Sequence, residues 1–361
     1  MYPDDFLKHK LQARRDDHSL RSLRIVDGMV DFCSNDYLGL AKNGLLRHAH
    51  ELASGSTGSR LLTGNSALAE ETERMIAAFH QAESALLFNS GYDANLGLLS
   101  AVPQKGDTIL YDQLSHASLR DGIRLSFAQS FSFLHNDLAD LRKKLSGTTG
   151  NVFIVTESLF SMDGDLCPLA DMLQLAESSG AHLIVDEAHA TGVIGERGEG
   201  LVQQLQLQEK VFARVHTFGK ACGCHGAVVL GSNELRDYLI NFARSLVYTT
   251  ALPPQAIAAI RRSYDVFPSM HNDREQLSRL IMQFQAAELA YSKAVSSTPI
   301  QAVFIPGNAS ARALAGRIRE HGIDARAILY PTVPKGAERL RIILHSYNTP
   351  EELDSLIKLL Q

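Results

Sequence analysis

Tryptophan is absent from this chain of 361 residues, and cysteine occurs only four times. The cysteines are too few and too scattered to indicate a disulfide framework. They are Cys33, Cys167, Cys222 and Cys224. The last two form a C-x-C pair beside His225, but no second pair completes a zinc site. We therefore expect no metal, and we interpret the pair as small-residue packing.

The chain also lacks an excess of positive charge and a long apolar run. Its formal net charge is −5, so no bulk positive field attracts nucleic acid or anionic lipid. No run approaches the roughly 18 apolar residues that span a bilayer. The opening stretch MYPDDFLKHKLQARRDD lacks the apolar segment of a secretory signal. These absences favour a cytoplasmic protein without nucleic-acid or membrane partners.

Short apolar runs alternate with helical stretches and loops through the first 250 residues, after a first helix predicted over 5–24. The runs read as strands and cover residues 29–33, 85–88, 108–111, 152–156, 182–185, 211–217 and 227–230. Strands that alternate with helices predict a largely parallel central sheet with helices on both faces. Such α/β sheets bind ligands outside the carboxyl ends of their strands.

The pattern changes after about residue 250, where Pro253 and Pro254 interrupt the helical texture. A long helix is predicted over 255–294, followed by a small α+β domain whose last helix has Thr349 as its N-cap and Pro350 at its first position. The predicted division of the chain is an N-terminal helix and strand segment (1–40), a large α/β domain (41–250), and a linking helix with the α+β domain (251–361).

Three predicted strands end in residues that carry chemistry. One strand runs into Asp186-Glu-Ala-His189, a second into Thr217-Phe-Gly-Lys220, and a third into Ser90-Gly91-Tyr92. Pyridoxal 5′-phosphate (PLP) chemistry needs groups of these kinds. It uses a lysine that forms a Schiff base, an acid at the pyridine nitrogen, a donor near the ring oxygen, and a helix N-terminus for the phosphate.

Each of these features alone has a simpler interpretation. A lysine after a strand is usually a solvated cation. The Asp-Glu-Ala-His string also matches the acidic motif of DEAH-type helicases. That family needs an upstream Gly-x-x-x-x-Gly-Lys-Ser/Thr phosphate loop, which this sequence lacks.

Taken together, the motifs resemble those of the α-oxoamine synthases, which are fold-type I PLP enzymes. The likeness covers nearly the whole chain. It includes Ser34-Asn-Asp-Tyr-Leu-Gly39, Ser115-His116-Ala-Ser, Thr156-Glu-Ser-Leu-Phe-Ser161-Met-Asp-Gly164-Asp, Asp186-Glu-Ala-His189-Ala-Thr-Gly192, Thr217-Phe-Gly-Lys220 and Tyr330-Pro-Thr332-Val-Pro334. The resemblance implies a fold-type I PLP transferase that acts as a homodimer with shared active sites.

The resemblance also implies catalytic and cofactor-binding residues. Lys220 binds PLP covalently and moves the substrate α-proton, Asp186 pairs with the pyridine nitrogen, and His189 reaches the ring oxygen. His116 stacks over the ring and guides the substrates, although a lone histidine is more often structural. The other cofactor-binding residues are Gly91, Tyr92, Ser161, Thr217, Thr249 and Thr250. Of these, Ser161 could be a turn residue only.

A second set of residues is implied for the substrates. Arg341 corresponds to the arginine that grips the amino acid carboxylate, a task that suits a bidentate guanidinium, although it could be a surface strand residue. Arg21 and Thr332 match residues that bind substrate. Asn35 and Thr249 or Thr250 would come from the partner subunit. His135 is interpreted as structural, in a His-Asn-Asp string that caps the next helix.

Among α-oxoamine synthases, the sequence favours the member that condenses L-alanine with a pimeloyl thioester in biotin biosynthesis. The short N-terminus with Arg14, Arg15 and Arg21 supports this choice, as does the order Lys220…Gly226-Ala227. The donor could be pimeloyl-CoA or a pimeloyl-carrier protein. Arg60-Leu-Leu departs from the usual His-Val-Ser near the acyl pocket. The alternatives are a glycine C-acetyltransferase, a serine-using palmitoyltransferase type, and a catalytically silent PLP-fold binding protein.

Overall fold

The computed structural model describes residues 5–47 and 52–361. The first four residues of the opening stretch, and residues 48–51 of the predicted large domain, lie outside the described part. Contacts divide the chain into two compact units. The larger unit contains Leu38–Ser161 and Leu166–Arg274, and the smaller one contains Met1–Tyr37, Met162–Asp165 and Glu275–Gln361. The predicted division at residues 40 and 250 stays a prediction.

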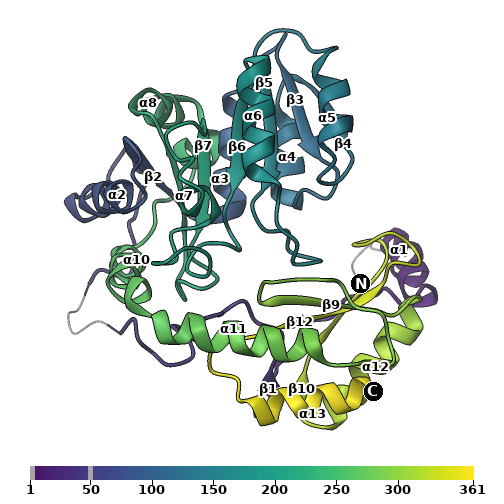
Figure 1. The fold of residues 1–361 in the computed structure, drawn as a ribbon. Helices are drawn as coiled ribbons and strands as arrows, with labels where there is room; N and C mark the ends of the chain where they lie inside the picture. The colour runs from purple at the N-terminus through teal and green to yellow at the C-terminus, as the bar shows by residue number, and fades with distance from the viewer. Residues whose placement is uncertain (1–4, 48–51) are drawn as a thin grey trace. The chain divides into compact units, whose positions relative to one another are not determined.

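The larger unit is built on a seven-stranded sheet, visible in the teal and green part of Figure 1. Its strand order is β2-β8-β7-β6-β5-β3-β4, and only β8 runs against the others. The strands are β2 (Ser84–Phe88), β3 (Thr108–Asp112), β4 (Gln129–Phe133), β5 (Val152–Glu157), β6 (His182–Asp186), β7 (Ala213–Thr217) and β8 (Ala227–Gly231). The largely parallel sheet predicted from the sequence is confirmed.

Helices cover both faces of this sheet. Neighbouring residues of β6 point to opposite sides: Ile184 belongs to one buried cluster with α3, α4 and α8, whereas Leu183 and Val185 belong to another with α5, α6 and α7. The helices of this unit are α2 (Ala67–Phe79), α3 (Gly91–Ala101), α4 (Ala117–Leu125), α5 (Leu138–Leu145), α6 (Leu169–Ser179), α7 (Leu201–Gln204), α8 (Asn233–Phe242), α9 (Arg244–Val247) and α10 (Pro254–Val266), with the 3-10 turn η1 (Phe267–Ser269).

The smaller unit has a three-stranded antiparallel sheet of order β11-β12-β9 and a short parallel pair, β1 with β10. The predicted α+β domain is confirmed, and the last helix has the expected cap, a reciprocal capping box of Thr349 and Glu352 with Pro350 at its start. Its elements are α1 (Asp5–Asp16), β1 (Val30–Asp31), β9 (Ile300–Phe304), α12 (Asn308–Glu320), β10 (Ile323–Asp324), β11 (Arg326–Ile328), β12 (Arg339–Ile343) and α13 (Pro350–Leu360).

Two predicted helices were wrong in extent. The helix expected over 5–24 ends at Asp16, because His18 adopts a left-handed φ of 53° and the amides of His18 and Ser19 close the helix end onto Arg15 and Arg14. The helix expected over 255–294 is interrupted after α10 by η1. It resumes as α11 (His271–Ala286), which starts in the larger unit and continues in the smaller one. Pro268 lies in the interruption, and it has no backbone N–H to donate to a continuing helix.

Strand β4 was missed in the sequence. Its residues QSFSF are mostly exposed, and it pairs only with β3 at the edge of the sheet. An edge strand with one buried residue carries no apolar run to reveal it.

No helix among residues 5–47 and 52–361 combines the length and apolar character needed to cross a membrane.

Two fully buried histidines pack together, His216 on strand β7 and His80 at the end of α2. The rings of His80 and His216 lie 4.1 Å apart between centroids. His80 Nε2 lies 2.9 Å from the Tyr264 hydroxyl, and His216 Nδ1 lies 2.8 Å from the Thr191 hydroxyl. Burial lowers the pKa of both rings well below their ordinary value, and the positive charge of Arg214 acts in the same direction. Both histidines are therefore neutral in the folded protein.

This pair predicts a loss of stability in acid. Because the folded pKa values are lowered, the unfolded chain takes up protons below pH ~6.5 that the folded chain refuses, at about 1.4 kcal/mol per pH unit for each histidine. Burial raises the pKa of Glu157 and Glu187, so these two groups make the folded protein more stable, not less, as the pH falls. To separate the histidines from the glutamates, we compare the wild type with His80→Gln in urea unfolding between pH 7.5 and 5.

The free energy of unfolding of the wild type should exceed that of His80→Gln at pH 7.5, and the gap should narrow as the pH falls below 6.5. His321→Gln, at an exposed position after α12, is the control and should keep the wild-type profile. A gap of constant size across this pH range would contradict a neutral buried pair.

Candidate active site

Three parallel strands of the larger unit end side by side. β5 ends at Glu157, β6 at Asp186 and β7 at Thr217, and Glu157 and Asp186 are direct partners in the strand register. The carboxyl ends of parallel strands are where an α/β sheet places its ligands. The strand ends that carry Asp186 and lead to Lys220 thus lie on one edge of the sheet.

The Asp186 carboxylate is held by two donors. The Asn95 side-chain amide donates to Oδ2 over 2.7 Å, and the Ala188 backbone amide donates to Oδ1 over 2.8 Å. The same amide nitrogen of Asn95 also lies 3.0 Å from the Ser118 hydroxyl. Since Asp186 is only 5% exposed, these bonds fix the orientation of its carboxylate.

Lys220 lies at the end of β7, close to the start of α3. Its Nζ donates to the Thr217 hydroxyl over 3.2 Å. A Cβ at Gly91, the first residue of α3, would lie 2.3 Å from Thr217 Cγ2, so only glycine lets the helix end approach this strand so closely. Ser90 caps α3 by accepting from the Asp93 amide. The first amides of a helix have no partner within the helix, and such helix starts are common binding places for phosphate groups.

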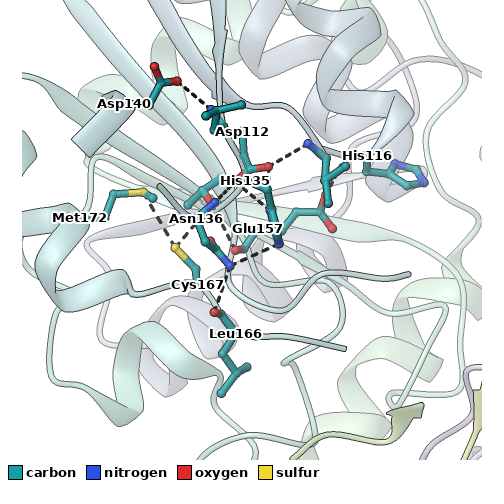
Figure 2. A network of polar contacts seen from close by, with 12 residues as sticks. Asp112, His116, His135, Asn136, Asp140, Glu157, Leu166, Cys167 and Met172 are labelled. Carbon is teal, nitrogen blue, oxygen red and sulfur yellow. Dashed lines mark hydrogen bonds and ion pairs between the residues drawn. The ribbon is translucent and has the colours of Figure 1, made fainter. Parts of the chain in front are cut away.

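His116 and Glu157 are linked on the neighbouring strand end, as Figure 2 shows. The His116 backbone amide donates to Glu157 Oε1 over 2.6 Å. Burial lowers the pKa of the His116 ring; the charge of Asp186 opposes that effect and the charge of Lys220 adds to it. Burial and then the charge of Asp186 raise the pKa of Glu157 well above its ordinary value. Burial therefore favours the uncharged forms of the His116 ring and of the Glu157 carboxyl, which is the register partner of Asp186.

His135 has a structural environment, as predicted. Its Nδ1 lies 3.0 Å from Asp112 Oδ1, and Asp112 also accepts from the Asn136 amide (Figure 2). Asp137 caps α5 by accepting from the amides of Ala139 and Asp140. The predicted helix cap is confirmed.

The remaining predicted cofactor residues also lie in the larger unit. His189 is buried and follows Asp186 by three residues, while Ser161 is half-buried after β5. The Tyr92 side chain is 45% exposed and donates to Asp121 of α4. Asn89, just before the cap of α3, donates over 3.1 Å to the Thr249 hydroxyl and over 2.9 Å to the Thr250 carbonyl. These threonines therefore adjoin the turn that leads into α3 of their own chain.

The predicted substrate residues form two pairs in the smaller unit. Arg21 donates to the Thr332 hydroxyl over 3.0 Å. Arg341, on β12, donates to Asn35 Oδ1 over 3.1 Å, and the buried Tyr37 hydroxyl donates to the same oxygen over 3.3 Å. The resemblance implied that Asn35 belongs to a partner's site, whereas here it contacts Arg341 of its own chain.

Two residues next to the site were not predicted from the sequence. Asn95 lies one helical turn after Gly91, so the helix that starts beside Thr217 also holds Asp186. Glu157 ends β5 in the register opposite Asp186. A polar residue four positions after a helix start, and an acid at the end of an apolar run, are signals that could have identified them.

Arg60, which departs from the family pattern, contacts residues of the larger unit. It forms a bidentate ion pair with the buried Glu73, at 2.7 Å and 3.1 Å, and also binds Asn65. The side chains that follow it are exposed, Leu61 by 51% and Leu62 by 81%. The departure from the family pattern at this loop thus places an internal ion pair and two exposed leucines there.

Within the described residues, no group of three or more His, Cys, Asp and Glu side chains is arranged to hold a metal ion. Burial raises the pKa of Cys222, and it raises that of Cys224 to about 12, so both are thiols at neutral pH.

Comparison with known proteins gives a consistent picture. The family model described as "Aminotransferase class I and II" matches residues 27–360. An 8-amino-7-oxononanoate synthase of Emericella nidulans is 44% identical, covering 98% of this chain and 94% of that protein. A solved 8-amino-7-oxononanoate synthase of Francisella tularensis has a TM-score of 0.77 at 30% identity, covering 92% of this chain and 97% of its own.

A solved serine palmitoyltransferase of S. paucimobilis, with bound PLP-myriocin, has a TM-score of 0.89 at 25% identity, covering 99% of this chain and 96% of its own. These likenesses extend over nearly the whole chain, as do the motifs quoted above. The chain therefore belongs to the aminotransferase class I and II family, in the α-oxoamine synthase branch that its motifs indicate.

Proposed function

We propose that this chain is a PLP-dependent 8-amino-7-oxononanoate synthase, an acyltransferase of biotin biosynthesis. It joins L-alanine to a pimeloyl thioester with loss of CO2. The observation that carries the proposal is the assembly of Lys220, Thr217 and Gly91 at one strand end. The chain that has this assembly is 44% identical, over 98% of its length, to a protein of that name.

PLP fits the residues of the larger unit. The helix start at Gly91 offers backbone amides to a phosphate, and a side chain at this position would fill the cradle. Lys220 supplies the amine that binds the cofactor aldehyde, and Asp186 supplies a fixed carboxylate for the pyridine nitrogen. When bound, PLP supplies the electron sink for bonds that break at the substrate α-carbon. We assign His189, Ser161, Thr217, Tyr92, Thr249 and Thr250 to the same cofactor.

The protein's own groups then move protons and orient the substrates. Lys220 takes the α-proton of alanine, and a carbon–carbon bond forms between that carbon and the thioester carbonyl as the thiol departs. The alanine carboxylate leaves as CO2, and Lys220 returns a proton to the same carbon. His116, neutral because burial lowers its pKa, offers hydrogen bonds without adding charge.

We assign the residues of the smaller unit to substrate binding. Arg341 grips the alanine carboxylate, and Asn35 holds the guanidinium in place. Arg21 and Thr332, which are already hydrogen-bonded to each other, bind the acyl donor. A guanidinium that is pre-positioned by a neutral partner loses less side-chain entropy when an anion binds.

A serine-using acyltransferase is the second candidate, because the S. paucimobilis serine palmitoyltransferase has a TM-score of 0.89. A glycine-using synthase is the third. A silent binding protein is disfavoured by the presence of Lys220, Asp186 and both histidines of the predicted site.

The choice of amino acid provides the test. We expect L-alanine to change the absorbance of the PLP-loaded enzyme and to give 8-amino-7-oxononanoate with pimeloyl-CoA. Glycine and L-serine should turn over at least about tenfold more slowly, the scale of one methyl or hydroxyl in a fitted pocket. Equal or faster turnover of glycine with acetyl-CoA, or of serine with palmitoyl-CoA, would sink the proposal.

We also propose a cytoplasmic homodimer. Large apolar side chains remain exposed on the larger unit, with Phe127 at 82% and Tyr248 at 73%, and such surfaces mark contacts between proteins. Light scattering of the purified holoenzyme should give about twice the 39.5 kDa mass of the chain. A monomer mass at micromolar concentration would argue against shared sites.

A further inference from the structure

Glu187 directly follows Asp186 and is fully buried, and the proton transfers described above do not use it. Its Oε1 accepts a hydrogen bond from the Val202 backbone amide over 2.6 Å, and its Oε2 accepts one from the Leu201 amide over 3.0 Å. The Ser158 hydroxyl donates to Oε2 over 2.9 Å. Both carboxyl oxygens are therefore bound by donors from two other segments of the chain.

These bonds join the two ends of the loop of residues 188–200. Glu187 lies just before the loop, whereas Leu201 and Val202 lie just after it, in the short helix α7. The two ends approach so closely that a Cβ at Gly200 would lie 2.7 Å from Glu187 Oε2, so only glycine fits at that position. One side chain thus holds the start of the loop against its end.

The same loop contacts the groups assigned to PLP at two places. Near its start, the Ala188 amide donates to Asp186 Oδ1 over 2.8 Å, and His189 follows directly. Farther along, Gly192 lies against Ala221, the residue after the lysine, because a Cβ at Gly192 would lie 2.6 Å from the Ala221 Cβ. A displacement of the loop would therefore disturb both the acid and the proposed donor to the ring oxygen.

We propose that Glu187 is a positioning residue, which holds the loop of residues 188–200 so that His189 can donate a hydrogen bond to the ring oxygen of PLP. The inference rests on the proposed function, because His189 can act in this way only if PLP binds at Lys220. A carboxyl group, charged or protonated, keeps an acceptor on each oxygen. A glutamine would turn its NH2 group toward one of the two backbone amides and lose at least one bond.

The test uses Glu187→Gln in the full-length holoenzyme. Absorbance measures the pH at which bound PLP loses its ~420 nm band, here called the Schiff-base band. Hydrogen exchange of the full-length chain without PLP measures the protection of the backbone amides of residues 188–202. The second measurement reports on the loop whether or not the cofactor is bound.

Asp107→Asn is the matched control. Asp107 is 7% exposed and also accepts three hydrogen bonds, from the backbone amides of Gln104 and Asn151 and from the Asn151 side chain. It directly precedes β3, so it lies at the amino ends of the parallel strands, away from the loop that follows β6. This variant should change neither measurement.

We expect the loop amides of Glu187→Gln to exchange about tenfold faster than those of the wild type, the scale of one lost hydrogen bond. The Schiff-base band should persist to a pH about one unit higher, a tenfold change in proton affinity. The reason is that a ring oxygen without its donor keeps more negative charge, which favours the proton on the neighbouring Schiff-base nitrogen.

Two results would overturn the proposal. Faster exchange with an unchanged titration of the Schiff-base band would make Glu187 a structural anchor only, and unchanged exchange would mean that the loop is held without it. If Glu187→Gln does not fold, Ser158→Ala decides instead, because it removes one bond to the same carboxyl group and should move both measurements in the same directions by less.

The proposed function can fail separately. A wild-type enzyme without the Schiff-base band would refute the binding of PLP by Lys220, and with it this inference. Either of the two results above would leave that band, and the proposed function, intact.

Discussion

Lys220→Ala is expected to abolish both turnover and the yellow colour of the purified enzyme. The amine of this lysine contacts Thr217, next to the helix start at Gly91. Loss of the group that binds PLP covalently removes the ~420 nm band of the bound cofactor and lowers kcat by about a million-fold, the scale of losing a catalytic nucleophile.

The measurement is an absorbance spectrum after incubation with excess PLP and gel filtration, followed by a single-turnover assay with L-alanine and pimeloyl-CoA. Lys210→Ala is the control, because Lys210 is surface-exposed and pairs with Glu177 at 3.0 Å. It should retain both colour and activity. A Lys220→Ala protein that kept the ~420 nm band and turned over substrate would refute the assignment of this lysine.

Much of the candidate site could be predicted because its residues lie at or directly after the ends of buried strands. The runs before Asp186 and Thr217 are apolar enough to be recognised as buried strands. Parallel strands in one sheet bring their carboxyl ends together. Local pattern and topology therefore bring Asp186 and the strand end before Lys220 to the same edge of the sheet.

The parts that could not be predicted depend on contacts distant in sequence. Asn95 bonds to Asp186 across 91 positions, and Arg21 bonds to Thr332 across 311. Such pairs leave no local periodicity. The arginines that line one pocket of the smaller unit likewise come from the first 24 residues and from residues 312–326, and each of them alone resembles a solvated charge.

The boundaries of elements were missed for a different reason. The basic, mostly polar stretch after Asp16 continues a helical pattern, yet the chain turns at His18 with a left-handed φ of 53°. A left-handed backbone conformation costs histidine little more free energy than it costs other polar residues. Tertiary contacts therefore decide whether the helix ends here. The amide of Ser19 bonds the carbonyl of Arg14, and that closure ends the helix.

Asp186→Asn is expected to retain the fold and lose most of the activity. Asparagine has the same shape and can keep the bond from the Ala188 amide. It lacks the negative charge that would hold a proton on the pyridine nitrogen, so the cofactor becomes a poorer electron sink. We expect kcat to fall about 10²–10³-fold, as when a preorganised electrostatic partner is removed from a transition state.

A graded set of variants separates charge from position at Asp186. Asn95→Ala leaves the charge but removes the 2.7 Å bond that orients the carboxylate, so PLP should bind about tenfold more weakly, the scale of one charge-assisted hydrogen bond.

Glu157→Gln, at the partner position on β5, should lose far less activity than Asp186→Asn. The reason is that burial and Asp186 raise the pKa of Glu157, which favours the uncharged form that glutamine resembles. PLP affinity by fluorescence titration and kcat by product formation measure the two effects independently. If Glu157→Gln proved as damaging as Asp186→Asn, the pyridine nitrogen would have to be assigned to a different carboxylate, or to the pair acting together.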